Sequence, residues 1–415
     1  MRDEMKKVPR LRFRGFSEDW ELCKFKGLLD EQDGIRRGPF GSALKKAFFV
    51  ENSEYVVYEQ QNAIYDTYET RYKISKEKFK ELEKFSISEG DFIMSGAGTI
   101  GRISRVPKGV AKGVFNQALI RFRTNTEVTD SEYFIQFVRA DKMQKKLTGA
   151  NPGSAITNLV PMSEIKKWDI LIPSKKEQIL VGLFLKKLDN TITLHQRKSD
   201  QLKELKKAYL QLMFPTKEER VPKLRFAAFE GEWAHRKLGE ITESFSGGTP
   251  TAGKSEYYGG DIPFIRSGEI SSDSTELFIT ENGLNSSSAK MVKVGDILYA
   301  LYGATSGEVG ISKITGAINQ AILAIRPSKN DNSYLIIQWL RKQKNTIIST
   351  YLQGGQGNLS SSIVKNLIIM LPQNKEEQEK VGMFFKQLDN IITLHQNKLE
   401  QLKDLKTSYL QNMFI

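Results

Sequence analysis

The sequence is poor in the residues that build disulfides and metal sites. Its 415 residues include one cysteine, Cys23, and three histidines, His195, His235 and His395. A single cysteine excludes an intramolecular disulfide, and so few Cys and His residues exclude a zinc site of the usual type. We therefore expect a protein of a reducing compartment that holds no metal and no cofactor of its own.

Long apolar runs are absent as well. No stretch approaches the roughly 18 consecutive apolar residues of a membrane-spanning helix, and no apolar run of a secretion signal follows Met1. These absences predict a cytoplasmic protein without a membrane partner.

Acidic residues are outnumbered by basic ones. The chain has 62 Lys and Arg against 49 Asp and Glu, which gives a formal charge of +13 and a pI near 9.4. Most of the excess lies in residues 1–214. Such a balance favours an acidic partner, and nucleic acid is the first expectation.

The chain contains an internal duplication. The segment Val8–Phe13 returns as Val221–Phe226, and residues 181–214 return as 381–414 with 23 of the 34 aligned positions identical. Two variable blocks of different sequence lie between these repeats. A duplication of this kind predicts two similar structural units.

The repeated segment 181–214 has the apolar spacing of a long helix. Its seam residues keep a seven-residue register typical of a coiled coil, and the second copy repeats them. The predicted seam consists of Leu188, Ile192, His195, Leu202 and Tyr209 in the first copy, and Leu388, Ile392, His395, Leu402 and Tyr409 in the second. We expect the two helices to pair with each other in antiparallel fashion, with the histidines as polar seam residues that help to set the register.

The variable blocks combine short apolar runs with Gly-rich loops, as in mixed globular domains. Strands are predicted at Tyr55–Tyr58, Asp91–Met94, Ala118–Phe122 and Ile297–Ala300, and helices at Ser131–Lys146 and Ser333–Leu352. The sequence therefore predicts an α/β (α+β) fold with an internal pseudo-twofold repeat. Its predicted parts are a domain over 1–173, a helix over 174–214, a hinge over 215–220, a domain over 221–372 and a helix over 373–415.

Several motifs recur in order along the two halves. The second half contains Lys237–Ile241, Gly247–Pro250, Tyr257–Ser267, Gly295–Leu298 and Asn319–Ala321, and the first contains Gly38–Ser42, Gly90–Asp91 and Asn116–Ala118. A proline followed by Glu-Gln begins each long helix, at Pro173 and Pro372. With these motifs the chain resembles the specificity subunit of type I restriction-modification systems over nearly its whole length. The first half lacks the stretch at 262–267 and has Tyr55–Gln60 instead.

This resemblance implies a DNA-binding subunit that performs no chemistry itself. Each globular domain would be a target-recognition domain for one half of a bipartite site in double-stranded DNA, and the helices would set the spacing. The implied partners are two methyltransferase (M) subunits and, in the full complex, restriction (R) subunits. S-adenosylmethionine, ATP and Mg²⁺ are implied for those partners. The sequence has no Asn/Asp-Pro-Pro-Tyr/Phe methyltransferase motif of its own.

Residues that differ between the halves are the candidates for reading different bases, because shared residues such as Asn116 and Asn319 fit a scaffold better. Arg suits guanine, and Asn or Gln suits adenine, although each side chain could equally contact phosphate. The first-half candidates are Arg36, Arg37, Phe40, Ser42, Gln60, Gln61, Asn62, Arg102, Arg105, Asn151, Ser154 and Asn158. The second-half candidates are Thr249, Thr251, Lys254, Tyr257, Arg266, Ser267, Tyr302, Thr305, Gln353, Gln356 and Asn358.

Two motifs suggest alternatives. Residues 248–255 match the Walker A pattern, but Ile241–Phe245 makes a poor buried strand and no good helix can start after Ser255. Gly96–Gly101 matches a dinucleotide pattern, but no helix is predicted after it. Both are interpreted as exposed loops. An NTPase that uses Lys254 and a stand-alone nucleic-acid-binding regulator remain as alternative functions.

Overall fold

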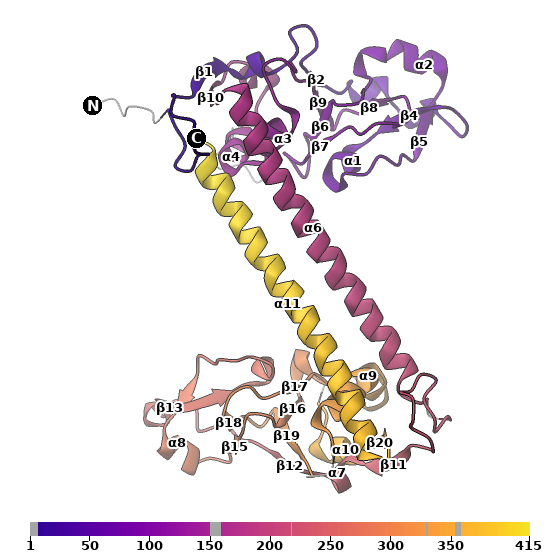
Figure 1. The fold of residues 1–415 in the computed structure, drawn as a ribbon, viewed down its shortest axis with the longest axis vertical. Helices are drawn as coiled ribbons and strands as arrows, with labels where there is room; N and C mark the ends of the chain where they lie inside the picture. Colours follow the sequence, from indigo (N-terminus) through magenta and orange to yellow (C-terminus); the bar gives the residue numbers. More distant parts are fainter. Residues whose placement is uncertain (1–6, 150–158, 217, 329–330, 353–357) are drawn as a thin grey trace. The chain divides into compact units, whose positions relative to one another are not determined.

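The computed structural model describes residues 7–149, 159–216, 218–328, 331–352 and 358–415 (Figure 1). The chain divides into two compact units. The first unit comprises Met1–His195 with Lys398–Ile415, and the second comprises Gln196–Asn397. Each long helix therefore contributes one part to each unit.

The first unit contains two four-stranded sheets and a two-stranded ribbon. The antiparallel sheet has the order β2 (Ile35–Arg37), β9 (Leu119–Phe122), β6 (Phe92–Ser95) and β7 (Ile103–Arg105). The other has the order β3 (Phe49–Val50), β5 (Tyr72–Ile74), β4 (Tyr55–Tyr58) and β8 (Gly113–Phe115), with β4 and β8 parallel. The ribbon pairs β1 (Glu21–Lys24) with β10 (Asp169–Ile172).

Short helices complete the first unit. They are α1 (Gln60–Tyr65), α2 (Lys76–Glu81), α3 (Ser131–Arg139), α4 (Asp141–Thr148) and α5 (Met162–Ile165). The single helix predicted over Ser131–Lys146 is wrong, because Ala140 is extended, with ψ of 139°, and separates α3 from α4. The core places Phe25, Phe134 and Leu185 between these helices, the first sheet and the start of the long helix.

The second unit repeats this arrangement. One sheet has the order β12 (Thr242–Ser246), β19 (Ile322–Pro327), β16 (Ile297–Ala300) and β17 (Val309–Ile311). The other has the order β14 (Phe278–Ile279), β13 (Tyr258–Ile265), β18 (Gly316–Ile318) and β15 (Lys290–Val292). Its ribbon pairs β11 (Ala234–Lys237) with β20 (Ile368–Leu371). The helices are α7 (Leu238–Ile241), α8 (Glu281–Asn285), α9 (Ser333–Tyr351) and α10 (Ser361–Lys365).

The two long helices are α6 (Lys175–Leu212) and α11 (Lys375–Met413), of 38 and 39 residues. In the first unit the rings of Phe184 and Tyr409 meet at 4.9 Å, and in the second those of Tyr209 and Phe384 meet at 5.0 Å. Residue numbers rise along one helix as they fall along the other, so the pairing within each unit is antiparallel. The predicted mixed α/β (α+β) fold with paired long helices is confirmed.

The predicted seam residues are all buried or half-buried. Five of them are buried, namely Leu188, Leu202, Leu388, Ile392 and Leu402, and Ile192, His195, His395, Tyr209 and Tyr409 are half-buried. Lysines flank the seam, with Lys406 Nζ 2.5 Å from Asp189 and Lys206 Nζ 2.6 Å from Asp389. Apolar contact and a paired charge thus recur at equivalent places.

The Glu-Gln pair at the start of each long helix attaches it to its globular part. Glu177 accepts two hydrogen bonds from Arg12, of 2.7 and 2.9 Å, and Glu377 accepts two of 2.6 Å from Arg225. The following glutamines accept from the N-cap backbone of earlier helices, Gln178 from Asp130 N before α3 and Gln378 from Asn332 N before α9. These repeated residues therefore have a structural role.

Candidate nucleic-acid interface

Strand directions bring the predicted loops of the first unit to one edge. Since β9 runs antiparallel to both β2 and β6, the ends of β2 and β6 meet the start of β9. In the other sheet the parallel strands β4 and β8 end side by side, where Asn116 N donates to Tyr58 O at 3.0 Å. Residues 38–42, 60–61, 96–102 and 116–118 form what we call the loop edge of this unit.

The second unit has the same arrangement. Strands β12 and β16 end where β19 begins, and the parallel strands β13 and β18 end together, with Asn319 N donating to Ile265 O at 3.4 Å. Asn358 forms a β-bridge with Tyr302 and joins the same loops. The loop edge of this unit consists of residues 247–254, 266–267, 301–308, 319–321 and 358.

Residues shared by the two edges hold the loops in place. The side-chain oxygens of Asn116 and Asn319 accept from Ala118 N and Ala321 N, both at 3.1 Å. A Cβ on Gly38 or Gly247 would lie 1.9 Å from a backbone carbonyl oxygen of the neighbouring strand connection, so only glycine fits. The two loop edges therefore share this backbone scaffold and differ in other side chains.

Four first-unit candidates are exposed at this edge. They are Arg37, Phe40, Ser42 and Arg102, and Phe40 is 89% exposed. Gln60 and Gln61 are half-buried. The Gln60 amide donates to the carbonyl oxygens of Ala97 and Thr99, the latter at 3.3 Å, and so supports the neighbouring loop.

Three first-unit candidates are placed differently from the expectation. Asn62 is fully buried, and its side chain donates to Thr67 O and Glu69 O and accepts from Glu59 N, so it has no group left for a base. Arg36 and Arg105 lie toward the opposite end of the sheet, where β2 and β6 begin and β7 ends. Arg105 there pairs with Glu132 at 3.1 Å.

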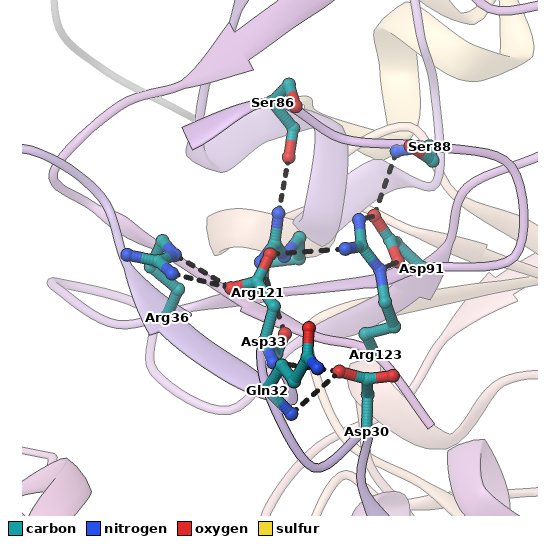
Figure 2. A network of polar contacts seen from close by, with 9 residues as sticks. All are labelled: Asp30, Gln32, Asp33, Arg36, Ser86, Ser88, Asp91, Arg121 and Arg123. Carbon is teal, nitrogen blue, oxygen red and sulfur yellow. Dashed lines mark hydrogen bonds and ion pairs between the residues drawn. The ribbon is translucent and has the colours of Figure 1, made fainter. Parts of the chain in front are cut away.

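Arg36 belongs to a cluster of arginines and aspartates at that opposite end (Figure 2). It donates to Asp33 at 2.7 and 2.9 Å, and the same carboxylate also contacts Arg121 and Arg123. Arg123 in turn pairs with both oxygens of Asp91 at 2.8 Å. Burial alone would raise the pKa of Asp33, but the arginines overcome this effect and lower it.

Arg121, like Arg123, belongs to this cluster but was not among the candidates from the sequence. Its side chain is 1% exposed, and it donates to Ser86 O at 2.7 Å. Burial and the nearby Arg123 charge lower its pKa. It lies directly across from Arg36 in the sheet, whereas the second unit has Phe245 opposite Ala324 at this place. Arg121 is the single charged residue of Leu119–Phe122, and no local pattern in the sequence indicates that this charge is buried.

Except for Tyr257, which lies just before the start of β13, the described second-unit candidates lie at their loop edge. Thr251 and Lys254 are exposed, and Thr249 is exposed while its hydroxyl donates to Gln320. The half-buried members are Tyr257, Ser267, Tyr302 and Thr305, and Asn358 is exposed. Arg266 is exposed but pairs with Glu269 at 2.6 Å, and this pairing raises the pKa of Arg266. Candidates Asn151, Ser154, Asn158, Gln353 and Gln356 lie outside the described residues.

The two nucleotide-like motifs form loops without the required helix. The strand before residues 248–255 is β12, none of whose residues is buried, and a 3₁₀ turn over Ser255–Tyr257 follows. Lys254 Nζ donates to the Tyr257 hydroxyl at 3.2 Å, which raises the pKa of Lys254. Gly96–Gly101 connects β6 and β7 as a hairpin loop. A phosphate-binding helix N-terminus therefore follows neither motif.

The described part of the chain contains neither a cluster of metal ligands nor a helix suited to cross a membrane. Over residues 7–149, 159–216, 218–328, 331–352 and 358–415, no three His, Cys, Asp or Glu side chains gather where they could hold a metal ion. Within the same ranges no helix combines the length and the apolar character needed to cross a bilayer.

Comparison with known protein families decides which family this architecture represents. The model of the type I restriction modification DNA specificity domain matches residues 19–204 and again 230–404. The chain belongs to this family. The resemblance identified from the sequence motifs is thus confirmed, and each match covers one of the duplicated halves.

Individual family members support the assignment. The chain is 29% identical over 200 residues to the EcoR124I/EcoR124II specificity subunit of Escherichia coli, which covers 43% of this chain and 49% of that protein. It is 29% identical over 195 residues to the MjaIX specificity subunit of Methanocaldococcus jannaschii, which covers 44% of each chain. The chain thus matches about half the length of these curated relatives.

Solved structures share the fold of this family member. The S subunit of the type I restriction-modification system from M. genitalium superimposes with a TM-score of 0.68, 15% identity, and coverage of 98% of this chain and 99% of that one. A chain from a study of assembly and conformational transition of a type I system gives a TM-score of 0.55 at 18% identity, with coverage of 95% and 97%.

Proposed function

We propose that this chain is the DNA-specificity subunit of a type I restriction-modification complex and performs no chemistry itself. Each unit reads one half of a bipartite site through its loop edge. The observation that carries the proposal is that both edges use the same glycine and asparagine scaffold but expose different side chains, such as Phe40 and Thr249. A common scaffold with different surface residues suits two similar domains that bind different sequences.

Basic residues at these edges supply the attraction to DNA. Arg37 and Arg102 are exposed at the edge of the first unit, and Lys254 is exposed at that of the second. Such cations gain affinity from the phosphate backbone without specifying sequence. Direct base contacts then come from the neighbouring polar and aromatic side chains.

The long helices set the separation of the half-sites. A helix of 38 residues, such as α6, spans about 57 Å at 1.5 Å per residue. Successive major-groove faces recur about every 34 Å along B-DNA, so a rigid helix of this length can fix a defined spacer.

The same helices dock the methyltransferase subunits. Leu194 and Leu394 occupy equivalent positions and are 66% and 67% exposed, and the equivalent pair Leu183 and Met383 is 53% and 56% exposed. Large apolar side chains left in solvent at repeated helix positions support two equivalent partner contacts. These partners bring S-adenosylmethionine, and restriction subunits bring ATP and Mg²⁺.

Base-resolved mapping of adenine methylation tests this function. Cells that express the chain with its cognate methyltransferase subunit should acquire a bipartite methylated motif that is absent when the methyltransferase is expressed alone. A Leu194→Glu/Leu394→Glu variant should keep its fold but lose the motif and the complex. Normal complex assembly without any new motif, together with sequence-specific binding by the isolated chain, would favour a stand-alone regulator.

A further inference from the structure

We propose that Phe40 is an apolar wedge that enters the base stack of DNA bound at the loop edge of the first unit. The inference rests on the proposed function and adds a deformation of the DNA to it. By a wedge we mean an apolar side chain inserted between neighbouring base pairs, which unstacks them and kinks the duplex.

The exposure of Phe40 is the first observation. The residue is 89% exposed, the largest value among the exposed large apolar residues of the described chain. A phenylalanine in water forgoes the stabilisation that burial would give it, so folding does not account for this residue. A partner that removes the ring from water would recover that stabilisation.

The backbone around Phe40 is held firmly, which is the second observation. Gly38 N donates to Leu119 O at 2.9 Å, and the close approach to Asn116 leaves no room for a Cβ on Gly38. Pro39 restricts its own φ, and Ala43 N donates to Phe40 O at 2.9 Å to close a turn. The exposed ring is therefore presented on a preorganised turn, which reduces the entropy lost on binding.

The electrostatic setting favours nucleic acid over an apolar protein surface. Residues 37–50 contain Arg37, Lys45 and Lys46 and no acidic residue. Arg37 and Arg102 are exposed at the same loop edge, where they can contact DNA phosphates. An aromatic ring among cations is the usual composition of a surface on which bases stack.

The second unit does not have this feature. Thr249 follows Gly247 as Phe40 follows Gly38, and its hydroxyl donates to Gln320. At this position the loop edge of the first unit therefore has an apolar ring, and that of the second unit has a short polar side chain. We expect distortion of the half-site read by the first unit and none at this position of the other half-site.

The test uses the chain assembled with its methyltransferase subunits and duplexes that carry 2-aminopurine at successive positions of each half-site. The wild-type complex should raise the fluorescence at one step of the first half-site, since unstacking relieves quenching. Phe40→Ala and Phe40→Thr should abolish this increase and weaken binding about ten- to a hundredfold. Phe40→Leu keeps an apolar side chain and should therefore retain part of the fluorescence increase and part of the binding affinity.

Controls separate the wedge from other roles. Val294 is 63% exposed and lies before the start of β16, toward the end of its sheet opposite the loop edge. Val294→Ala should change neither the DNA affinity nor the fluorescence. Thermal unfolding of Phe40→Ala should match that of the wild type because the ring has few native contacts to lose.

The outcomes that overturn the proposal are distinct. Unchanged affinity and fluorescence in Phe40→Ala would refute it. It would also be refuted if Phe40→Ala and the wild type bound equally well to DNA in which uracil replaces thymine, because the ring would then contact the thymine methyl group. Weaker assembly with the methyltransferase subunits at unchanged DNA binding would place Phe40 in a protein interface and refute it too. Failure of the wild-type complex to bind or methylate any bipartite site would instead refute the proposed function.

Discussion

Replacing Glu377 with alanine should strongly destabilise the second unit. The Glu377 carboxylate is fully buried and accepts two hydrogen bonds of 2.6 Å from Arg225 and one of 3.3 Å from Trp233 Nε1. The Arg225 side chain is only 14% exposed, so it would keep a charge without a counter-ion. Removing one partner of a buried ion pair costs about 3–5 kcal/mol. For a unit of this size that loss lowers Tm by about 6–20 °C.

The first unit provides the matched control. Glu177 pairs with Arg12 in the same way, but Trp20 Nε1 has no hydrogen-bond partner among the described residues. Glu177→Ala should therefore cost about 1 kcal/mol less than Glu377→Ala, the contribution of one hydrogen bond. Calorimetry and denaturant unfolding monitored by tryptophan fluorescence measure both losses.

A double variant tests the physical cause. In Arg225→Met/Glu377→Met both charges are removed and apolar volume is kept, so most of the lost stability should return. A Tm for Glu377→Ala within about 2 °C of the wild type, or a double variant as unstable as the single one, would refute the reasoning.

The remaining predictions concern recognition, spacing and acid stability. Arg37→Gln should weaken DNA binding without changing the motif and reduce the slope of log affinity against log salt by about 0.9; an altered motif would make Arg37 a base contact. Four residues inserted into α6 should change the spacer or break assembly while each half-site keeps its identity, which methylome sequencing shows directly. Exchange of residues 20–172 for another recognition domain should change one half-site, and a change in both would contradict modular recognition. Burial alone would raise the pKa of Asp296, but hydrogen bonds from Arg326 and Lys293 lower it. The stability that this carboxylate adds is therefore complete above about pH 4 and is lost as pH falls through the lowered pKa. Unfolding of Asp296→Asn should depend less on pH in that range, and an unchanged dependence would exclude this pair as its source.

Local patterns predicted the regular elements well. Tyr55–Tyr58 and Ile297–Ala300 form β4 and β16 over the predicted residues, because alternating or continuous apolar side chains favour strands between glycine-rich turns. The long helices α6 and α11 were predicted because apolar residues recur there at helical spacing. The predicted helix over Ser131–Lys146 was wrong at Ala140, whose extended conformation is set by packing and not by its helix propensity.

Individual site residues were harder to assign. Asn62 looks like a polar neighbour of Gln60 and Gln61, yet the turn of α1 directs it into the protein and the other two toward the surface. Arg36 and Arg37 are adjacent in sequence, but successive side chains of a strand point to opposite faces, so only Arg37 is left exposed. Sequence spacing alone does not show which face is covered.

The sequence by itself determined the duplication, the basic character, the long helices and the family, because these follow from composition, periodicity and repeated motifs. Only the tertiary structure decided which polar residues are available to a ligand. The backbone oxygen of Asp33 that Arg121 contacts lies 88 positions away in the chain, and the loop edges form where strands distant in sequence end together. Burial and strand direction are properties of long-range packing, so no local pattern could specify them.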